Sequence, residues 1–191
     1  MPNWCSNNIT IQGPAEKIAA LWAAAQAEDS GLLQALRPMP AELQDTEAPN
    51  ASPNWYDWRV TNWGTKWDID QEGLEFELLP DGRAMIHGWF DSAWSPPTGA
   101  YEQFCENNDD VYICASYFEP GMGFIGIWDN EDIGDVCYDD VGGLIVGKAE
   151  EDDSQLMDLF DEFNVWDWYE TDEDEENLEI DLDGGVSATN E

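Results

Sequence analysis

Residues 75–90, EFELLPDGRAMIHGWF, have the pattern of a β-hairpin. Hydrophobic and polar side chains alternate on both sides of Pro80-Asp81-Gly82, and a period of two is typical of strands with one buried face. Proline, aspartate and glycine favour tight turns. The segment therefore predicts two adjacent antiparallel strands and makes an antiparallel sheet the basis of the fold.

Four further segments have strand patterns. They are Ile9-Thr10-Ile11, which stops at Gly13-Pro14, TKWDIDQ (65–71), and VYICASYF (111–118) and GFIGIW (123–128) on either side of Glu119-Pro120-Gly121. Helical patterns are found in PAEKIAALWAAAQA (14–27), WYDWRVTNWG (55–64), AYEQFCENN (100–108) after Pro96-Pro97, and SQLMDLFDEFNVWDW (154–168). Hairpins mixed with helices, without regular β-α-β repeats, predict an α+β fold. Residues 28–53 contain four prolines and predict a long surface connection.

The charge of the chain is extreme. It has 43 Asp and Glu against 6 Lys and Arg, a formal net charge of −37 in 191 residues. Eleven tryptophans and 42% hydrophobic residues are far more than a disordered acidic chain contains, so we expect a folded core. Such a charge disfavours direct binding to nucleic acid or to an anionic membrane.

The last third carries most of this charge. Residues 129–191 hold 24 of the 43 acids and one base, Lys148. The helix predicted at 154–168 has Leu156, Leu159 and Phe160 on one face and acids on another. In DEDEENLEIDLD (172–183), hydrophobic residues alternate with acids, which predicts a strand with one acidic face. We therefore expect a main domain at 1–150 and an acidic helix-strand extension at 151–191, packed on the same core or mobile.

Four blocks of sequence resemble a known family. MPNWCSN, WYDWRVTNWGTKWD, FDSAWSPP and YFEPGMGFIG occur in this order within residues 1–127 and resemble the Api92-like family of phage proteins, also called the YubB ferredoxin-like family after a plasmid member. The resemblance implies a ferredoxin-like antiparallel sheet with helices on one face, and an origin in phages or plasmids. It brings no catalytic motif, and residues beyond about 128 do not match the family pattern.

Signals of catalysis and of metal binding are weak. His87 is the chain's one histidine, and no G-x-S-x-G, P-loop or H-E-x-x-H motif occurs, so we expect no enzyme and no cofactor. Glu179 to Gly184 approaches a calcium loop, but the twelfth position is Asn190 where a glutamate is needed. The four cysteines lie far apart, which predicts reduced and mostly packed thiols. Without a membrane span or a signal segment, we expect a cytoplasmic location.

The tryptophans permit two interpretations. Six of them could form a platform on which nucleobases stack, but such platforms lie beside cationic grooves. Residues 55–67, which hold four of these tryptophans, contain only two bases, Arg59 and Lys66, so we favour a packed tryptophan core. Arg59 and Lys66 are then expected to form structural ion pairs with carboxylates such as Asp57 or Asp68.

The charge itself is the remaining candidate for function. A domain of this length spans about 40 Å, and duplex DNA of that length holds about 24 charges. The chain's 37 net charges exceed this number. Acids on one face of a strand repeat every ~6.6 Å. We therefore predict a DNA mimic that occupies the basic nucleic-acid groove of a host defence or recombination protein.

The predicted partner-binding residues all lie in the acidic last third. They are Asp152, Asp153, Asp158, Asp161, Glu162, Asp172, Glu173, Asp174, Glu175, Glu176, Glu179, Asp181 and Asp183. Two alternatives stay open: an acidic adaptor that binds a basic partner without competing with DNA, and a solvated surface that serves solubility or adaptation to high salt. The sequence also leaves open whether the active form is a dimer.

Overall fold

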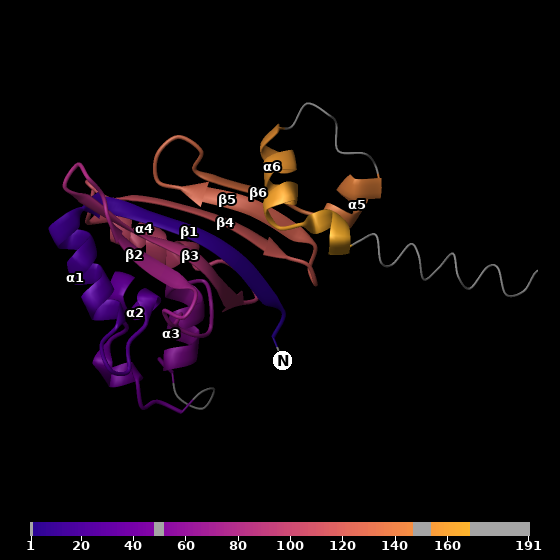
Figure 1. Ribbon diagram of the computed structural model, residues 1–191. Helices are drawn as coiled ribbons and strands as arrows, with labels where there is room; N and C mark the ends of the chain where they lie inside the picture. The colour runs from indigo at the N-terminus through magenta and orange to yellow at the C-terminus, as the bar shows by residue number, and fades with distance from the viewer. Residues whose placement is uncertain (1, 48–51, 147–153, 169–191) are drawn as a thin grey trace, which may run out of the picture. The chain divides into compact units, whose positions relative to one another are not determined.

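An antiparallel sheet with strand order β2-β3-β1-β4-β5-β6 organises the first part of the chain. The computed structural model describes residues 2–47, 52–146 and 154–168 (Figure 1). The contacts divide the chain into two units, Met1–Val141 and Gly142–Glu191. The sheet belongs to the first unit, which therefore has the mixed α+β architecture that the sequence predicts.

The central strand is β1 (Trp4–Pro14), which pairs with β3 (Arg83–Ala93) on one side and with β4 (Tyr112–Glu119) on the other. The edge strand β2 (Leu74–Leu78) pairs with β3, and Gly82 has a φ of +83° at the predicted Pro80-Asp81-Gly82 turn. On the other side β5 (Phe124–Asp129) pairs with β4 and then with β6 (Asp135–Tyr138). The predicted hairpins are confirmed, and β6 is an additional strand.

The helices of the first unit cover one face of this sheet. The main ones are α1 (Ala15–Ala25) and α4 (Thr98–Glu106), and α3 is shorter (Trp55–Asn62). Ile9 and Ile11 of β1 are buried in one cluster with Ile18 of α1 and Tyr101 of α4. In Figure 1, α1, α2 (Leu32–Leu36) and α3 lie together on one side of the sheet.

Two predictions about the connections are wrong. Residues 28–53 do not merely cross the surface: they form α2 (Leu32–Leu36) and the 3-10 helix η1 (Ala41–Leu43), and Leu32 and Leu33 are fully buried. TKWDIDQ (65–71) is a loop and not a strand. Asp68 is the physical reason, because its carboxylate accepts hydrogen bonds from Leu33 N (2.8 Å) and Gln34 N and so caps α2.

Beyond β6 the chain forms α5 (Val141–Val146), and in the second unit α6 (Ser154–Glu162). The acidic strand predicted around Leu178 to Leu182 lies outside the described residues. Within the part of the chain that the structure describes, no helix combines the length and the apolar content that crossing a membrane requires.

Candidate functional site

Three of the predicted partner-binding residues are described, and all three are on α6. Asp158 and Asp161 are exposed and Glu162 is half-buried, while Leu156, Leu159 and Phe160 are buried. The two-faced pattern predicted for this helix is therefore present over Ser154–Glu162. The other ten residues lie outside the described part of the chain: Asp152, Asp153, Asp172, Glu173, Asp174, Glu175, Glu176, Glu179, Asp181 and Asp183.

The helix predicted at 154–168 is interrupted. It ends at Glu162, and Asn164 has a φ of +50°, in the left-handed region that asparagine tolerates better than most residues. After this turn Trp166 contacts Phe160 with its ring centroid 5.3 Å away and the ring planes at 80°. The aromatic pair thus forms across a turn and not along one continuous helix.

An acidic hairpin that the sequence analysis missed joins β5 to β6. Five carboxylates in residues 131–140 are exposed, and this segment contains no base. The turn is built around Asp129, which is 5% exposed and accepts hydrogen bonds from Glu131 N (3.1 Å), Ile133 N (3.0 Å) and Gly134 N (3.1 Å). The exposed acids are Glu131, Asp132, Asp135, Asp139 and Asp140.

Neighbouring strands hold this hairpin in place. Asn130 Oδ1 accepts a hydrogen bond from Ile113 N (2.8 Å), and its Nδ2 donates to Val111 O (2.9 Å). Tyr117 donates its hydroxyl hydrogen to Asp135 Oδ1 (3.2 Å), and burial together with the nearby Cys137 and Asp135 raises the pKa of Tyr117. The acids are therefore displayed on a fixed frame. The signal in the sequence was the run DNEDIGD, whose Asp, Asn and Gly residues favour a turn.

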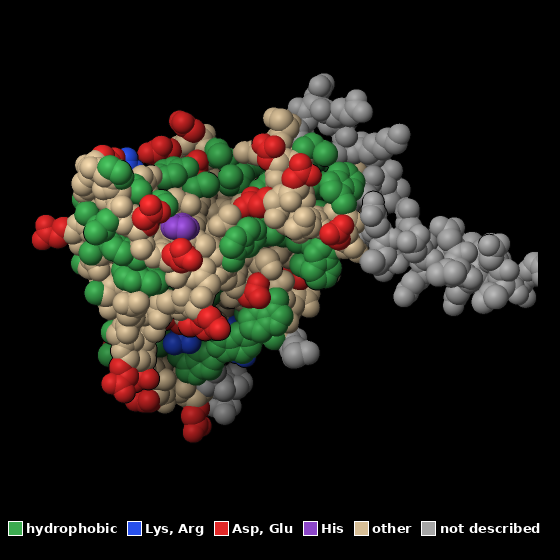
Figure 2. All heavy atoms as spheres, in the orientation of Figure 1, with side chains coloured by type: hydrophobic (Ala, Val, Ile, Leu, Met, Phe, Trp, Pro, Cys, Tyr) green, Lys and Arg blue, Asp and Glu red, His purple; other side chains and the backbone are tan. Residues whose placement is uncertain are grey.

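Acidic residues also lie on many other parts of the first unit. Residues 1–141 contain 25 acids and five bases, which leaves 20 net negative charges on this unit alone. Figure 2 shows Asp and Glu side chains dispersed over the visible face, with few Lys or Arg among them. The negative surface therefore does not depend on the C-terminal residues alone.

The bases of the aromatic region do not pair with carboxylates as predicted. The Arg59 guanidinium lies 4.8 Å from the ring centroid of Trp63 and 5.4 Å from that of Trp55. Lys66 Nζ lies 4.5 Å from the ring centroid of Trp67. Desolvation lowers the pKa of Arg59, so its surroundings are partly dry. No salt bridge of Arg59 or Lys66 is formed among the described residues, so the predicted direct ion pairs are wrong, although Asp68 lies near enough for its charge to favour the ionised form of Arg59.

The prediction of a packed tryptophan core is only partly right. Trp63 is fully buried and its indole N–H donates to Arg37 O (2.8 Å), as expected for a buried indole. Four tryptophans of the first unit are instead exposed by more than a third: Trp4, Trp67, Trp89 and Trp94. Trp94 also has a φ of +72°, unusual for a large side chain. Sequence alone did not separate these exposed rings from Trp63.

The candidate catalytic and metal-binding groups are dispersed. His87 Nε2 lies 3.9 Å from Glu77 Oε2, between neighbouring strands of the sheet. No group of three or more His, Cys, Asp or Glu side chains among residues 2–47, 52–146 and 154–168 is arranged to hold a metal ion. The calcium-like sequence at 179–184 lies outside these ranges. None of the cysteines among the described residues forms a disulfide, and Cys5 is buried whereas Cys137 is exposed.

The fold and its surface therefore describe an acidic α+β protein with an ordered acidic hairpin. No protein-family model matches the chain, and no curated protein matches it. Among solved structures it is similar to the crystal structure of a protein api92 from Yersinia pseudotuberculosis, with the family model DUF1281. The identity is 16%, the TM-score is 0.38, and the match covers 61% of this chain and 39% of that chain. A likeness at this level carries no functional argument.

Proposed function

We propose that this protein is a non-enzymatic DNA mimic of phage or plasmid origin that occupies the basic nucleic-acid groove of a host defence or recombination protein. The observation that carries the proposal is the β5–β6 hairpin, where Glu131 and Asp132 stand on a turn fixed by Asp129 and Asn130, and three more exposed carboxylates, Asp135, Asp139 and Asp140, stand at the two ends of β6. Ordered acids lose little conformational freedom when they replace phosphates in a basic groove, and this favours binding.

The fold proposed for this mimic is ferredoxin-like. The order β2-β3-β1-β4, with α1 between β1 and β2 and α4 between β3 and β4, supports such a core. Strands β5 and β6 then extend the core at one edge of the sheet and carry the acidic hairpin. Asp135 lies in the edge strand β6 and the other four acids lie just before or after it, and charged side chains at a sheet edge also disfavour pairing with another sheet.

The electrostatic argument follows from the two units. The first carries 20 net negative charges, and residues 142–191 contain 18 acids and one base and so carry 17. Lysines and arginines of a DNA-binding groove gain free energy when condensed counterions are released on pairing with such a surface. Binding is then expected to be fast and to weaken steeply with salt.

The test is competition with DNA. The purified protein is titrated into duplex-binding assays of a panel of restriction nucleases, exonucleases and recombinases. We expect displacement of DNA from at least one of them, with an apparent affinity that falls as salt rises. A ternary complex of target, DNA and this protein would instead identify an adaptor. If this protein bound to no member of the panel even without DNA present, that result would also contradict the mimic.

Two variants of equal net charge locate the surface. The hairpin variant is E131Q/D132N/D135N/D139N/D140N, and its matched control is E16Q/E28Q/D29N/E102Q/E106Q, in which all five residues are exposed and lie on or beside α1 and α4. We expect the hairpin variant to inhibit about tenfold more weakly than the control. The hairpin variant loses direct contacts with the target, and this lowers the affinity more than the same change in net charge elsewhere does. Equal inhibition by both variants would show that the hairpin is not the binding surface.

The C-terminal acids are tested separately. Reversing the charge of Asp158, Asp161, Glu179 and Asp181 together is expected to abolish inhibition if these residues share the surface, with circular dichroism as the control for folding. Unchanged inhibition would show that the binding surface consists of residues of the first unit only.

A further inference from the structure

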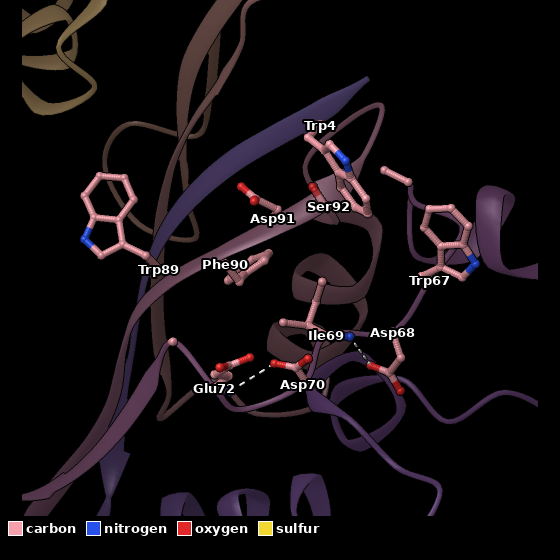
Figure 3. Close-up of a pocket in the computed structure, with 12 residues that line it drawn as sticks. Trp4, Trp67, Asp68, Ile69, Asp70, Glu72, Trp89, Phe90, Asp91 and Ser92 are labelled. Atoms are coloured by element: carbon pink, nitrogen blue, oxygen red, sulfur yellow. Dashed lines mark hydrogen bonds between the residues drawn. The ribbon is translucent and has the colours of Figure 1, made fainter. Parts of the chain in front are cut away.

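A cleft of about 450 Å³ opens between the end of β3 and the loop of residues 65–73. Its volume is within the range of about 300–1,000 Å³ typical of small-ligand sites. In Figure 3, Trp4 and Trp67 lie at one end of the cleft and Trp89 at the other, with Phe90 and Ile69 between them. The cleft is therefore bounded at both ends by tryptophan side chains that are exposed by more than a third.

The cleft exists because the edge of β3 is only partly paired. Strand β2 accompanies β3 as far as Leu74 opposite Gly88, and Trp89 N then donates to Gly73 O (3.0 Å). The loop returns to the strand at Ala93, whose N–H donates to Thr65 Oγ1 (2.9 Å). Alternate residues of an antiparallel strand direct their backbone groups to the same edge. The N–H and C=O of Asp91 therefore face the loop between these two anchors.

The loop that forms the other wall is held by the helices beneath it. Leu32 N donates to Ile69 O (2.9 Å), and the Asp68 carboxylate caps α2. Gln71 Nε2 donates to Ala25 O at the end of α1. Gly31 fits under this loop because a Cβ at that position would lie 2.4 Å from Ile69 O. The wall is thus fixed before any ligand binds, which lowers the cost of binding.

The aromatic end of the cleft favours cations. The rings of Trp4 and Trp67 have centroids 5.7 Å apart and planes tilted by 34°, and both side chains are exposed by more than a third. Lys66 Nζ already lies 4.5 Å from the centroid of Trp67. Tryptophan rings attract cations more strongly than other aromatic side chains do. Because Lys66 already contacts Trp67, the Trp4 ring is the one at this end of the cleft that is suited to a second positive group.

The rim of the cleft is negative. Asp70, Glu72 and Asp91 are exposed, and no Lys or Arg is among the residues that line the cleft. Asp70 Oδ1 accepts a hydrogen bond from Glu72 N (3.0 Å), and Asp91 Oδ1 accepts one from Ser6 Oγ (2.9 Å). Figure 3 shows Asp70 and Glu72 together on the loop and Asp91 on β3 opposite them. Anionic ligands are disfavoured here.

We infer that this cleft binds the guanidinium group of an arginine side chain presented by a protein partner. The carboxylates surround the cleft and do not converge as metal ligands among the described residues. A planar, delocalised cation can stack on an indole and donate hydrogen bonds to several carboxylates at once, as an ammonium group cannot. The guanidinium groups of two of the chain's own arginines, Arg37 and Arg59, already lie 5.8 Å and 4.8 Å from the ring centroids of other tryptophans.

The inference does not depend on the acidic hairpin, because the cleft residues are all within 4–93 and the hairpin is at 129–140. The probe is N-acetyl-arginine amide, followed by NMR of the indole N–H resonances of the uniformly ¹⁵N-labelled full chain. The signals of Trp4 and Trp67 are assigned with the single variants Trp4→Phe and Trp67→Phe. We expect saturable shifts of these two signals.

Two neutral or altered probes separate guanidinium recognition from general attraction. N-acetyl-citrulline amide has nearly the same shape without the charge, and it is expected to bind about tenfold more weakly or not at all. N-acetyl-lysine amide with a free side-chain ammonium is expected to bind more weakly than the arginine probe. Equal binding of citrulline, or tighter binding of lysine, would overturn the assignment.

Matched variants locate the site. D70N/E72Q/D91N keeps the side-chain oxygens that accept the internal hydrogen bonds and removes three charges, and E16Q/E28Q/D29N removes three exposed charges elsewhere. We expect the first variant to lose about tenfold in affinity for the arginine probe and the second to lose little. Equal losses, or shifts at indoles away from the cleft, would overturn the proposal. The hairpin variant is expected to bind the probe as the parent does.

Discussion

Three of the chain's six bases, Arg37, Arg59 and Lys66, lie against aromatic rings although acids outnumber bases by 43 to 6. Exposed ion pairs contribute only about 0–1 kcal/mol, whereas a desolvated cation on an indole contributes about 2 kcal/mol. Arg59 Nε is buried without a hydrogen-bond partner among the described residues, so ring contacts, together with the charge of the nearby Asp68, surround this guanidinium. Tryptophan thus takes the role in the first unit that carboxylates were predicted to have.

The buried thiol of Cys5 is expected to make the fold less stable at alkaline pH. Desolvation raises the pKa of Cys5 from 9.0 to about 12. Since the folded state holds this proton more tightly than the unfolded state, the stabilisation is complete below pH 9 and is lost as the pH rises toward 12. We expect the free energy of unfolding to fall by up to about 1.4 kcal/mol per pH unit from this thiol, measured by urea denaturation.

The variant Cys5→Ala is the comparison. It is expected to be less stable than the parent at pH 7 because it leaves a cavity, yet to lose stability less steeply between pH 9 and 11. Burial raises the pKa of Cys105 only to about 11. This thiol is therefore expected to lower the stability over a narrower pH range, between 9 and about 11, and serves as a control. Parallel pH profiles for the parent and Cys5→Ala would contradict the assignment.

At the level of elements, the acidic hairpin depends on Asp129. Its carboxylate accepts three backbone hydrogen bonds within the turn, and Asp129 N donates to Gly134 O (2.8 Å). We expect Asp129→Ala to lower the free energy of unfolding by about 2–3 kcal/mol, because hydrogen bonds to a charged group contribute more than neutral ones. Hydrogen exchange should become faster for the amides of residues 131–138.

Asp129→Asn is the control for this prediction. It keeps the Oδ1 acceptor and loses only the charge, so its stability is expected to lie between those of the parent and Asp129→Ala. An alanine variant with unchanged exchange across β5 and β6 would show that strand pairing alone holds the hairpin.

Sequence patterns correctly predicted the helices and strands that are specified by their own local sequence. The hairpin at 75–90, the helix after Pro14 and the strands around Glu119-Pro120-Gly121 all carry both a period and a turn signal, and all are present. TKWDIDQ has a strand period, but Asp68 is recruited to α2, a contact that no local pattern reveals. Strand β6 is four residues long and is defined by its pairing with β5.

The candidate sites were less predictable than the fold because they are assembled from distant segments. Exposed and buried tryptophans have the same local signature, so Trp63 could not be separated from Trp4 and Trp67 before their neighbours were known. The cleft joins residue 4 and parts of 67–73 and 89–93, which are brought together by the pairing of β3 with β1 and with β2 and by the hydrogen bonds that tie the loop to β3. Composition predicted the negative surface, since a net charge needs no tertiary information.

For the whole molecule, the net charge of −37 predicts that salt stabilises the fold. Like charges oppose compaction, and the screening length falls from about 10 Å at 0.1 M to about 3 Å at 1 M ionic strength. We expect the melting temperature to rise by about 5 °C or more between about 20 mM and about 1 M sodium chloride. A melting temperature that falls with salt would mean that attractive ion pairs outweigh the repulsion.

The two five-residue variants separate this global effect from local recognition. The hairpin variant and its control on the helices have the same net charge, so both should respond to salt less than the parent and by similar amounts, because repulsion summed over many charges depends little on which five are removed. Inhibition of a DNA-binding target should differ between them, because recognition depends on where the carboxylates are held. If instead the two variants differ in salt response and agree in inhibition, the hairpin contributes to the stability of the sheet and the negative surface acts only through its total charge.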